Sequence, residues 1–330
     1  MRGAQKGAKL LGKEENKVSQ KKKKLPKKQG YTMKLVKRNW ELYLFIIPTL
    51  VYLILFNYAP IYGLLMAFKN FKFSKGIMGS DWVGLKWFIK FFESPRFWLL
   101  IENTLKLSIY SLIVGFPLPV ILALILNNVK NKKWKKFAQT ITYMPHFIST
   151  VVLVSMINLF FAPKTGIVNY VLAALGGSGS TYFMGSEKYF PHMYVWSGVW
   201  QGVGWSSIIY LSALAGVDQQ LHEAAMIDGA NKWKRLLHID LPSIAPTVII
   251  TLIMSCGSIL GVGWEKTYLM QNDLNMATSE VISTYVYRVG MIQFDYSYST
   301  AIGLFNSVVN FILLVLVNQI SRKVSDTSLW

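Results

Sequence analysis

The chain has 330 residues, of which 52% are apolar and only 15% are charged, and its formal net charge is +19. Soluble domains carry about 25% charged residues, so this composition excludes an ordinary soluble protein and predicts a membrane protein. The single cysteine excludes an internal disulfide, and the four histidines show no metal-ligand spacing, so we expect no metal site.

Residues 1–39 form a strongly basic segment. They contain 14 of the 35 lysines and arginines against two acids, Glu14 and Glu15, a net charge of +12. A segment so poor in apolar residues cannot bury enough surface to fold, so we expect a disordered tail. A nucleic-acid arm is one interpretation. We favour a tail beside the anionic cytoplasmic leaflet, with no nucleic-acid partner.

Six apolar stretches follow, and we expect residues 40–330 to form one all-helical transmembrane domain. A bilayer core about 30 Å thick needs roughly 20 helical residues. The stretches that meet or nearly meet this length are residues 41–68, 98–127, 138–162, 192–216, 246–264 and 298–320. The first is too long for the core of a signal peptide, so we expect it to be retained.

The distribution of basic residues predicts that both termini are cytoplasmic. With this orientation the inner segments carry 24 lysines and arginines and the outer loops carry 10. Cytoplasmic segments of membrane proteins are enriched in these residues. Without the basic tail the count is 10 to 10. The remaining support for this orientation is the short loop Lys130–Lys136, which contains five lysines.

A charged segment of about 25 residues separates the fourth and fifth stretches. Asp218 is a plausible N-cap for a first helix, and Gly229 can adopt the positive φ that a helix end requires. We predict a second helix from Asn231 to Ile239 that ends at Leu241-Pro242, because a residue before proline avoids the helical region. Connections between bundled helices normally take two to eight residues, so this length favours a docking surface over a simple connection.

The sequence EAAMIDGANKWKRLLHIDLP in this segment resembles the EAA loop of ABC-importer permeases. Every fixed position of that pattern is present: Glu223, Ala224, Ala225, Asp228, Gly229, Ala230, Ile239, Leu241 and Pro242. One departure is that Leu236 and Leu237 stand where many relatives carry an aromatic residue. Further segments over about residues 40–330 resemble the LplB-type permeases of oligosaccharide importers.

The resemblance implies a type I ABC-importer permease of the bacterial cell membrane, with residues 218–242 as the coupling loop between spans four and five. The residues expected to engage the ATPase are Glu223, Ala224, Ala225, Asp228, Gly229, Ala230, Trp233, Leu236, Leu241 and Pro242. The implied partners are a second permease in a heterodimer, a cytoplasmic ATPase dimer, a lipid-anchored solute-binding protein and a sugar. ATP and magnesium would bind to the ATPase, because this chain lacks a GxxxxGK[ST] motif.

The aromatic and amide residues of the later spans are candidates for a sugar path, since sugars present both apolar ring faces and hydroxyl groups. The predicted path residues are Trp200, Gln201, Glu265, Tyr268 and Asn306. The alternative for the tryptophans is the aromatic belt found at membrane interfaces.

Other functions are disfavoured by what the sequence lacks. A membrane enzyme such as a glycosyltransferase would need an acidic metal or nucleotide-sugar motif, and none is visible. A secondary transporter would show titratable residues in mid-span. Glu102 and Lys106 lie one helical turn apart near the outer start of span two, and we expect them to pair. An ABC importer of a non-sugar solute stays an alternative.

Overall fold

A computed structural model describes residues 39–324 and 327–330, so the predicted basic tail lies outside the described residues apart from Asn39. The contacts divide the chain into two units, Met1–Tyr62 and Gly63–Trp330. The regular secondary structure of the described residues is helical, as expected, apart from one short antiparallel pair. This pair consists of β1 (Lys69–Asn70) and β2 (Asp81–Trp82), in which Lys69 pairs with Trp82.

The first predicted span is helical from Trp40 to Phe68. It begins as α3 (Trp40–Leu53), passes through a π-helical turn at Ile54–Tyr58 and continues as a 3-10 helix over Ala59–Phe68. Pro60 explains the wider turn, because its ring would clash with the carbonyl of Phe56 in a regular α-helix. The side chains of α3 are unburied within the chain, as suits a lipid-facing helix.

The second unit contains the remaining helices. They are α4 (Gly76–Gly79), α5 (Lys86–Phe92), α6 (Phe97–Gly115), α7 (Pro117–Asn127), α8 (Lys132–Tyr143), α9 (Thr150–Phe160), α10 (Ile167–Ala174), α11 (Phe190–Ala215), α12 (Gln219–Ile227), α13 (Lys232–Arg235), α14 (Leu241–Gly257), α15 (Trp264–Met270), α16 (Met276–Ser279), α17 (Ile282–Tyr287) and α18 (Tyr296–Val324). Short 3-10 turns cover Phe73–Lys75 and Met144–Phe147, and π turns cover Leu236–Asp240 and Arg288–Ile292.

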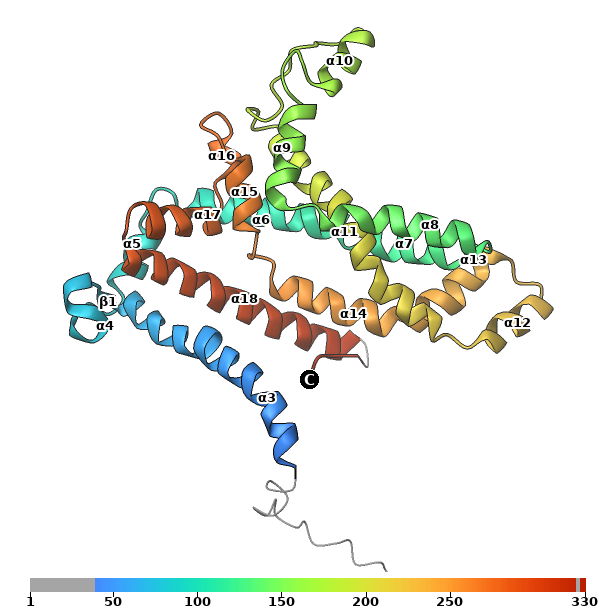
Figure 1. Cartoon of the computed structure of the whole chain (residues 1–330), viewed down its shortest axis with the longest axis horizontal. Coiled ribbons are helices and arrows are strands. Elements are labelled where there is room, and N and C mark those ends of the chain that lie inside the picture. Colours follow the sequence, from blue (N-terminus) through green and yellow to red (C-terminus); the bar gives the residue numbers. More distant parts are fainter. Residues whose placement is uncertain (1–38, 325–326) are drawn as a thin grey trace, which may run out of the picture. The chain divides into compact units, whose positions relative to one another are not determined.

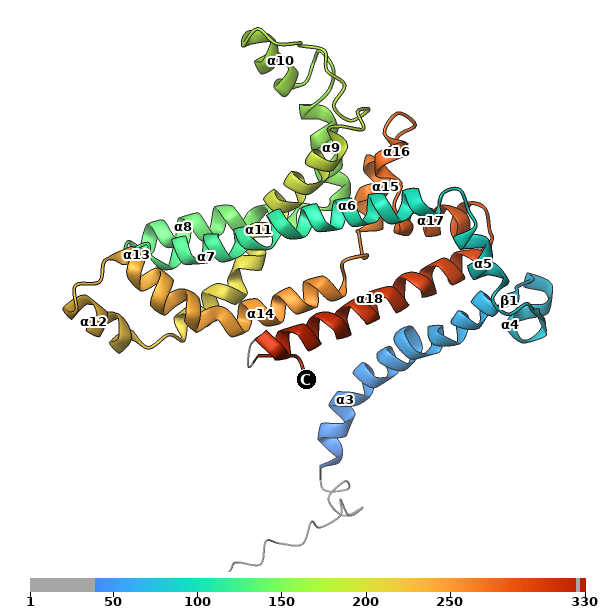
Figure 2. The same cartoon turned by 180° about the vertical axis from the view of Figure 1, so that it is seen from behind.

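Long helices of the second unit lie side by side in two groups (Figures 1 and 2). Helix α11 packs against α6, α7 and α8, and α14 packs against α18. Helix α11 also contacts α14 and so joins the groups. At this junction Val120, Leu124, Tyr210, Leu214 and Ile244 form a buried apolar cluster. In this packing, hydroxyl-bearing residues of α6, α11 and α14 line one common cavity.

Four helices of the described part are long and apolar enough to cross a membrane: Trp40–Phe68, Phe97–Asn127, Lys232–Gly257 and Tyr296–Val324. They cover the expected first, second, fifth and sixth spans. The fifth, however, begins earlier and ends earlier than the predicted 246–264. The fourth expected span forms α11, which has sufficient length but contains many serine, glycine and tryptophan residues and is not among these four.

The third predicted span, residues 138–162, is not one straight helix. The helical segments Lys132–Phe147 and Thr150–Phe160 meet at an angle of 98°, and they count as a fifth crossing only if the bent pair is taken as one span. Pro145 stands in the last turn before the bend. The Ser149 hydroxyl then accepts a hydrogen bond from the Val152 amide and starts a new helix.

Candidate functional site

The charged segment before α14 forms a helix–turn–helix, as predicted. The Asp218 side chain accepts a hydrogen bond of 2.9 Å from the Gln220 amide and begins α12. Gly229 has a φ of +75° and ends that helix, a conformation that glycine adopts without a steric penalty. The Asn231 side chain then accepts from the Lys234 amide at 2.9 Å and begins α13. Local capping chemistry therefore fixes both ends of the turn.

The prediction that the second helix stops at Leu241-Pro242 is wrong. The chain stays helical from Lys232 to Gly257. A π-helical turn at Leu236–Asp240 leads directly into α14, and Pro242 occupies the first turn of that helix. Proline fits there because the wider turn does not require its missing N–H. The second half of the helix–turn–helix and the expected fifth span are consequently one continuous helix.

The outward face of the helix–turn–helix combines charge with exposed apolar side chains. Glu223, Ala224 and Asp228 are exposed. Ile227 is 87% exposed and Trp233 is 71% exposed, which is unusual for such large apolar residues. Leu236, Ala225 and Ala230 of the predicted docking residues are half-buried, and Leu236 packs on the apolar cluster between α7, α11 and α14. In this structure it joins the loop to the helices.

A second link was not anticipated from the sequence. The His222 Nε2 atom of α12 lies 3.3 Å from Asp240 Oδ1 in the π turn, and both side chains are largely buried. The contact ties the two halves of the helix–turn–helix together. The two residues are 18 positions apart, and this spacing does not predict a contact from the sequence. They meet only because the turn at Gly229 and Asn231 brings the two helices together.

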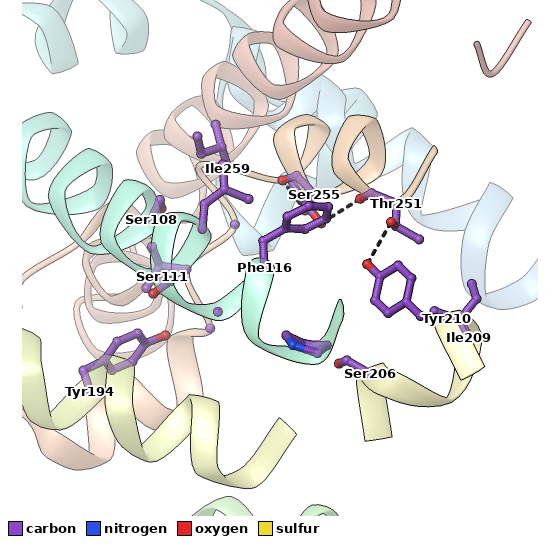
Figure 3. Close-up of a pocket in the computed structure, with 17 residues that line it drawn as sticks. Ser108, Ser111, Phe116, Tyr194, Ser206, Ile209, Tyr210, Thr251, Ser255 and Ile259 are labelled. Carbon is purple, nitrogen blue, oxygen red and sulfur yellow. Dashed lines mark hydrogen bonds between the residues drawn. The ribbon is translucent and has the colours of Figure 1, made fainter. Parts of the chain in front are cut away.

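A cavity of about 490 Å³ lies between α6, α7, α11, α14 and the segment before α15. Hydroxyl groups dominate its polar lining (Figure 3), which includes Ser108, Ser111, Tyr194, Ser206, Tyr210, Thr251, Ser255 and Ser258. The Tyr210 and Thr251 hydroxyls form a hydrogen bond of 2.9 Å. The buried Ser108 Oγ has no hydrogen-bond partner among the described residues. Such a lining can exchange hydrogen bonds with a hydroxyl-rich solute.

A second cavity of about 310 Å³ adjoins the first and shares five lining residues with it: Ser111, Gly115, Pro119, Tyr194 and Ser206. Its further lining includes Gln201 and Lys266. The Gln201 Nε2 atom donates a hydrogen bond of 2.7 Å to the Ile148 carbonyl, at the bend between α8 and α9. The two cavities therefore form one polar region, to which Gln201 contributes from α11.

The other predicted path residues lie apart from this region. Trp200 is 46% exposed and lines an apolar pocket with residues of α9. Asn306 lines another cavity beside Trp264 and Tyr287, and its buried Oδ1 has no partner among the described residues. The Tyr268 ring lies 5.0 Å from that of Tyr287, next to the same cavity.

Glu265 is exposed and lines none of these cavities. The structure therefore does not bring the five predicted path residues together. Sequence inspection missed the serines of the polar cavity, because isolated serines in apolar helices also occur where they bond only their own helix. The predicted Glu102–Lys106 pair is present, with 2.5 Å between Oε1 and Nζ.

Apolar helices around a polar cavity, with an exposed charged helix–turn–helix before α14, are what the membrane subunit of a solute transporter requires. Residues 115–326 match the family described as the binding-protein-dependent transport system inner membrane component, and the chain belongs to this family. It is thus a transport subunit of the bacterial inner membrane and not itself an enzyme.

Two relatives from Bacillus subtilis (strain 168) resemble almost the whole chain. Protein LplB is 43% identical over 90% of this chain and 93% of its own length. The polygalacturonan/rhamnogalacturonan transport system permease protein YteP is 40% identical over 92% of this chain and 94% of its own.

A similar solved structure belongs to a bacterial alginate ABC transporter in complex with an alginate pentasaccharide-bound periplasmic protein. Its matching chain is 38% identical, with a TM-score of 0.83, and the match covers 91% of this chain and all of that one. The type I permease fold expected from the sequence is thereby confirmed.

Proposed function

We propose that this chain is one of two membrane subunits of an ABC importer that moves an oligosaccharide into the cell. The hydroxyl-lined cavity between α6, α7, α11 and α14 carries this proposal, because its lining matches the hydrogen-bonding groups of a sugar. Relatives support the substrate class: they include YteP, the arabinooligosaccharides permease AraP and the alginate importer.

Permeases of this family work with a binding protein, another permease and an ATPase. We further propose that the second permease is a different chain, that the ATPase is a dimer which binds ATP and magnesium, and that the binding protein is lipid-anchored. The chain would cross the membrane six times with both termini inside. The charge count between inner and outer segments supports this orientation.

The exposed helix–turn–helix is the proposed ATPase contact. Its apolar tips at Ile227 and Trp233 would bury surface against the partner, while Glu223 would meet a basic or amide donor. Because Lys232–Gly257 is one helix, a displacement of the loop would move Thr251 and Ser255, which line the cavity. The same helix would thereby join the energy source to the sugar path.

The test is sugar uptake and sugar-stimulated ATP hydrolysis by the reconstituted complex. Glu223→Ala is expected to lower stimulated hydrolysis and ATPase co-purification several-fold without loss of folded protein, because an exposed charge contributes little to stability. Asp81→Ala removes another exposed carboxylate, from β2, and is the matched control. Equal behaviour of the two variants would exclude the helix–turn–helix as the ATPase contact.

A further inference from the structure

Lys266 places a cation at the wall of the smaller cavity. It lies on α15, between the last two spans, and its Nζ atom donates a hydrogen bond of 2.8 Å to the Tyr194 carbonyl of α11. The same Nζ lies 4.7 Å from the centroid of the Tyr194 ring. Gln201, Ser111 and Ser206 line the cavity around it.

The charge of Lys266 has no carboxylate partner among the described residues. Several other cations do have one: Lys75 with Asp81, Lys90 with Asp295, Lys106 with Glu102, and Arg96 and Arg288 with Glu280. Burial lowers the pKa of Lys266 to about 8. At pH 7 about nine tenths of the side chain is still protonated, so a cation remains in a partly desolvated place. Such a position is unfavourable unless an anion approaches it.

We propose that Lys266 pairs with the carboxylate of an acidic sugar, so that the imported solute is an oligosaccharide containing uronate residues. This inference rests on the proposed function as a sugar importer. The Lys266 ammonium would bind the carboxylate while the neighbouring serine hydroxyls and the Gln201 amide exchange hydrogen bonds with the sugar hydroxyls. The Tyr194 hydroxyl is a further hydrogen-bonding group in the lining of both polar cavities.

The single charge favours a carboxylate over a phosphate ester. A phosphate carries up to two negative charges and three acceptor oxygens, and its sites usually supply an arginine fork or several donors together. This cavity offers one ammonium, with no arginine in its lining. One reversible ion pair also suits a transport path, where a solute has to leave as readily as it enters.

Two glycines of α11 provide a matched pair of tests that leave the lysine in place. A Cβ atom at Gly198 would lie 3.1 Å from Lys266 Nζ, so Gly198→Ala should push the ammonium aside. A Cβ atom at Gly202, one helical turn further on, would meet nothing within 4 Å. Both glycines line the same cavity, so Gly202→Ala controls for the added methyl group.

The experiment measures uptake by the full complex in proteoliposomes. The probes are labelled galacturonate and mannuronate trisaccharides and their carboxyl-reduced neutral counterparts. Each variant is compared with the parent on the same sugar, so that the preference of the binding protein cancels. Lys266→Met should lower uptake of the acidic sugars about ten- to a hundredfold, the usual effect of losing a hydrogen bond to a charged group, and spare the neutral ones.

Further variants separate recognition from structure. Lys266→Arg should retain acidic uptake, and Gly198→Ala should lower acidic uptake more than Gly202→Ala does. Lys188→Met is the control lysine, because Lys188 also lies over a tyrosine ring, 5.8 Å from the Tyr189 centroid, but lines neither polar cavity. Equal losses of acidic and neutral uptake in Lys266→Met would overturn the inference, as would a parent that imports only neutral sugars. A parent that imports no sugar would instead refute the proposed function.

Discussion

Gly229 lies at the turn of the helix–turn–helix with a φ of +75°. Its substitution can distinguish an effect on the stability of this chain from an effect on binding of the ATPase. A Cβ atom at this position would meet nothing within 4 Å, so the substitution creates no clash with the rest of the chain. The remaining cost is backbone strain. A left-handed conformation costs most residues about 1–2 kcal/mol, and asparagine and aspartate less.

We therefore expect Gly229→Asn and Gly229→Asp to lower the free energy of unfolding by about 1 kcal/mol or less, and Gly229→Ala by somewhat more. Asparagine and aspartate have nearly the same size and the same tolerance of positive φ. They differ in charge, and the aspartate would stand directly beside Asp228 on the exposed face. A difference in ATPase binding between these two variants would therefore show that the partner surface is sensitive to negative charge at this turn.

The assay is co-purification of the ATPase with the permease pair, followed by sugar-stimulated ATP hydrolysis. Gly229→Asp should lose both, Gly229→Asn should keep most of each, and thermal unfolding of the isolated membrane subunits should differ little between them. If Gly229→Asp matched Gly229→Asn in every assay, charge at this turn would have no part in docking. Parent-like behaviour of all three variants would show that the ATPase docks elsewhere.

Three further predictions concern topology, the tie within the loop and the sugar path. In a Cys256→Ala background, cysteines at Ser178 and Ser328 should react with an impermeant reagent from opposite sides of the membrane; reaction from one side would refute the six-span orientation. His222→Phe, which removes the contact with Asp240, should lower the ratio of sugar imported to ATP hydrolysed with little loss of stability. An unchanged ratio would show that this contact is purely structural. Among the five predicted path residues, alanine at Gln201 should lower uptake most, without loss of ATPase binding, because Gln201 alone of the five lines the polar cavities. Uptake unchanged in all five variants would favour the aromatic-belt interpretation.

Local chemistry was the most predictable part of this molecule. Asp218 and Gly229 could be assigned from the sequence because a cap or a helix end depends on one residue and its near neighbours. The bend after Pro145 also had a local signal, a proline followed by a capping serine at Ser149. It was missed because the apolar stretch is continuous in hydropathy, although the helix within it is broken.

The path of the chain through Pro242 was less predictable, because a π turn has no sequence signature that distinguishes it from a helix end. The polar cavity was harder still. Its lining comes from α6, α7, α11, α14 and the segment before α15, and the lining residues are up to 155 positions apart, between Ser108 and Gly263. Only the packing of these helices decides which serines face the cavity and which face lipid.

The π turn at Leu236–Asp240 keeps the chain helical through Pro242, and this continuity determines how motion can pass along it. A helix that stopped at Pro242 would leave a joint between the proposed docking loop and the expected fifth span, and motion of the loop would be lost in that joint. Instead the 26 residues Lys232–Gly257 extend over about 39 Å at 1.5 Å per residue. Leu236 packs against the membrane helices at one end of this segment, and Ser255 lines the cavity near the other. A partner that moves the loop therefore acts on the cavity wall through a single element, which is what a transporter driven by a separate ATPase requires.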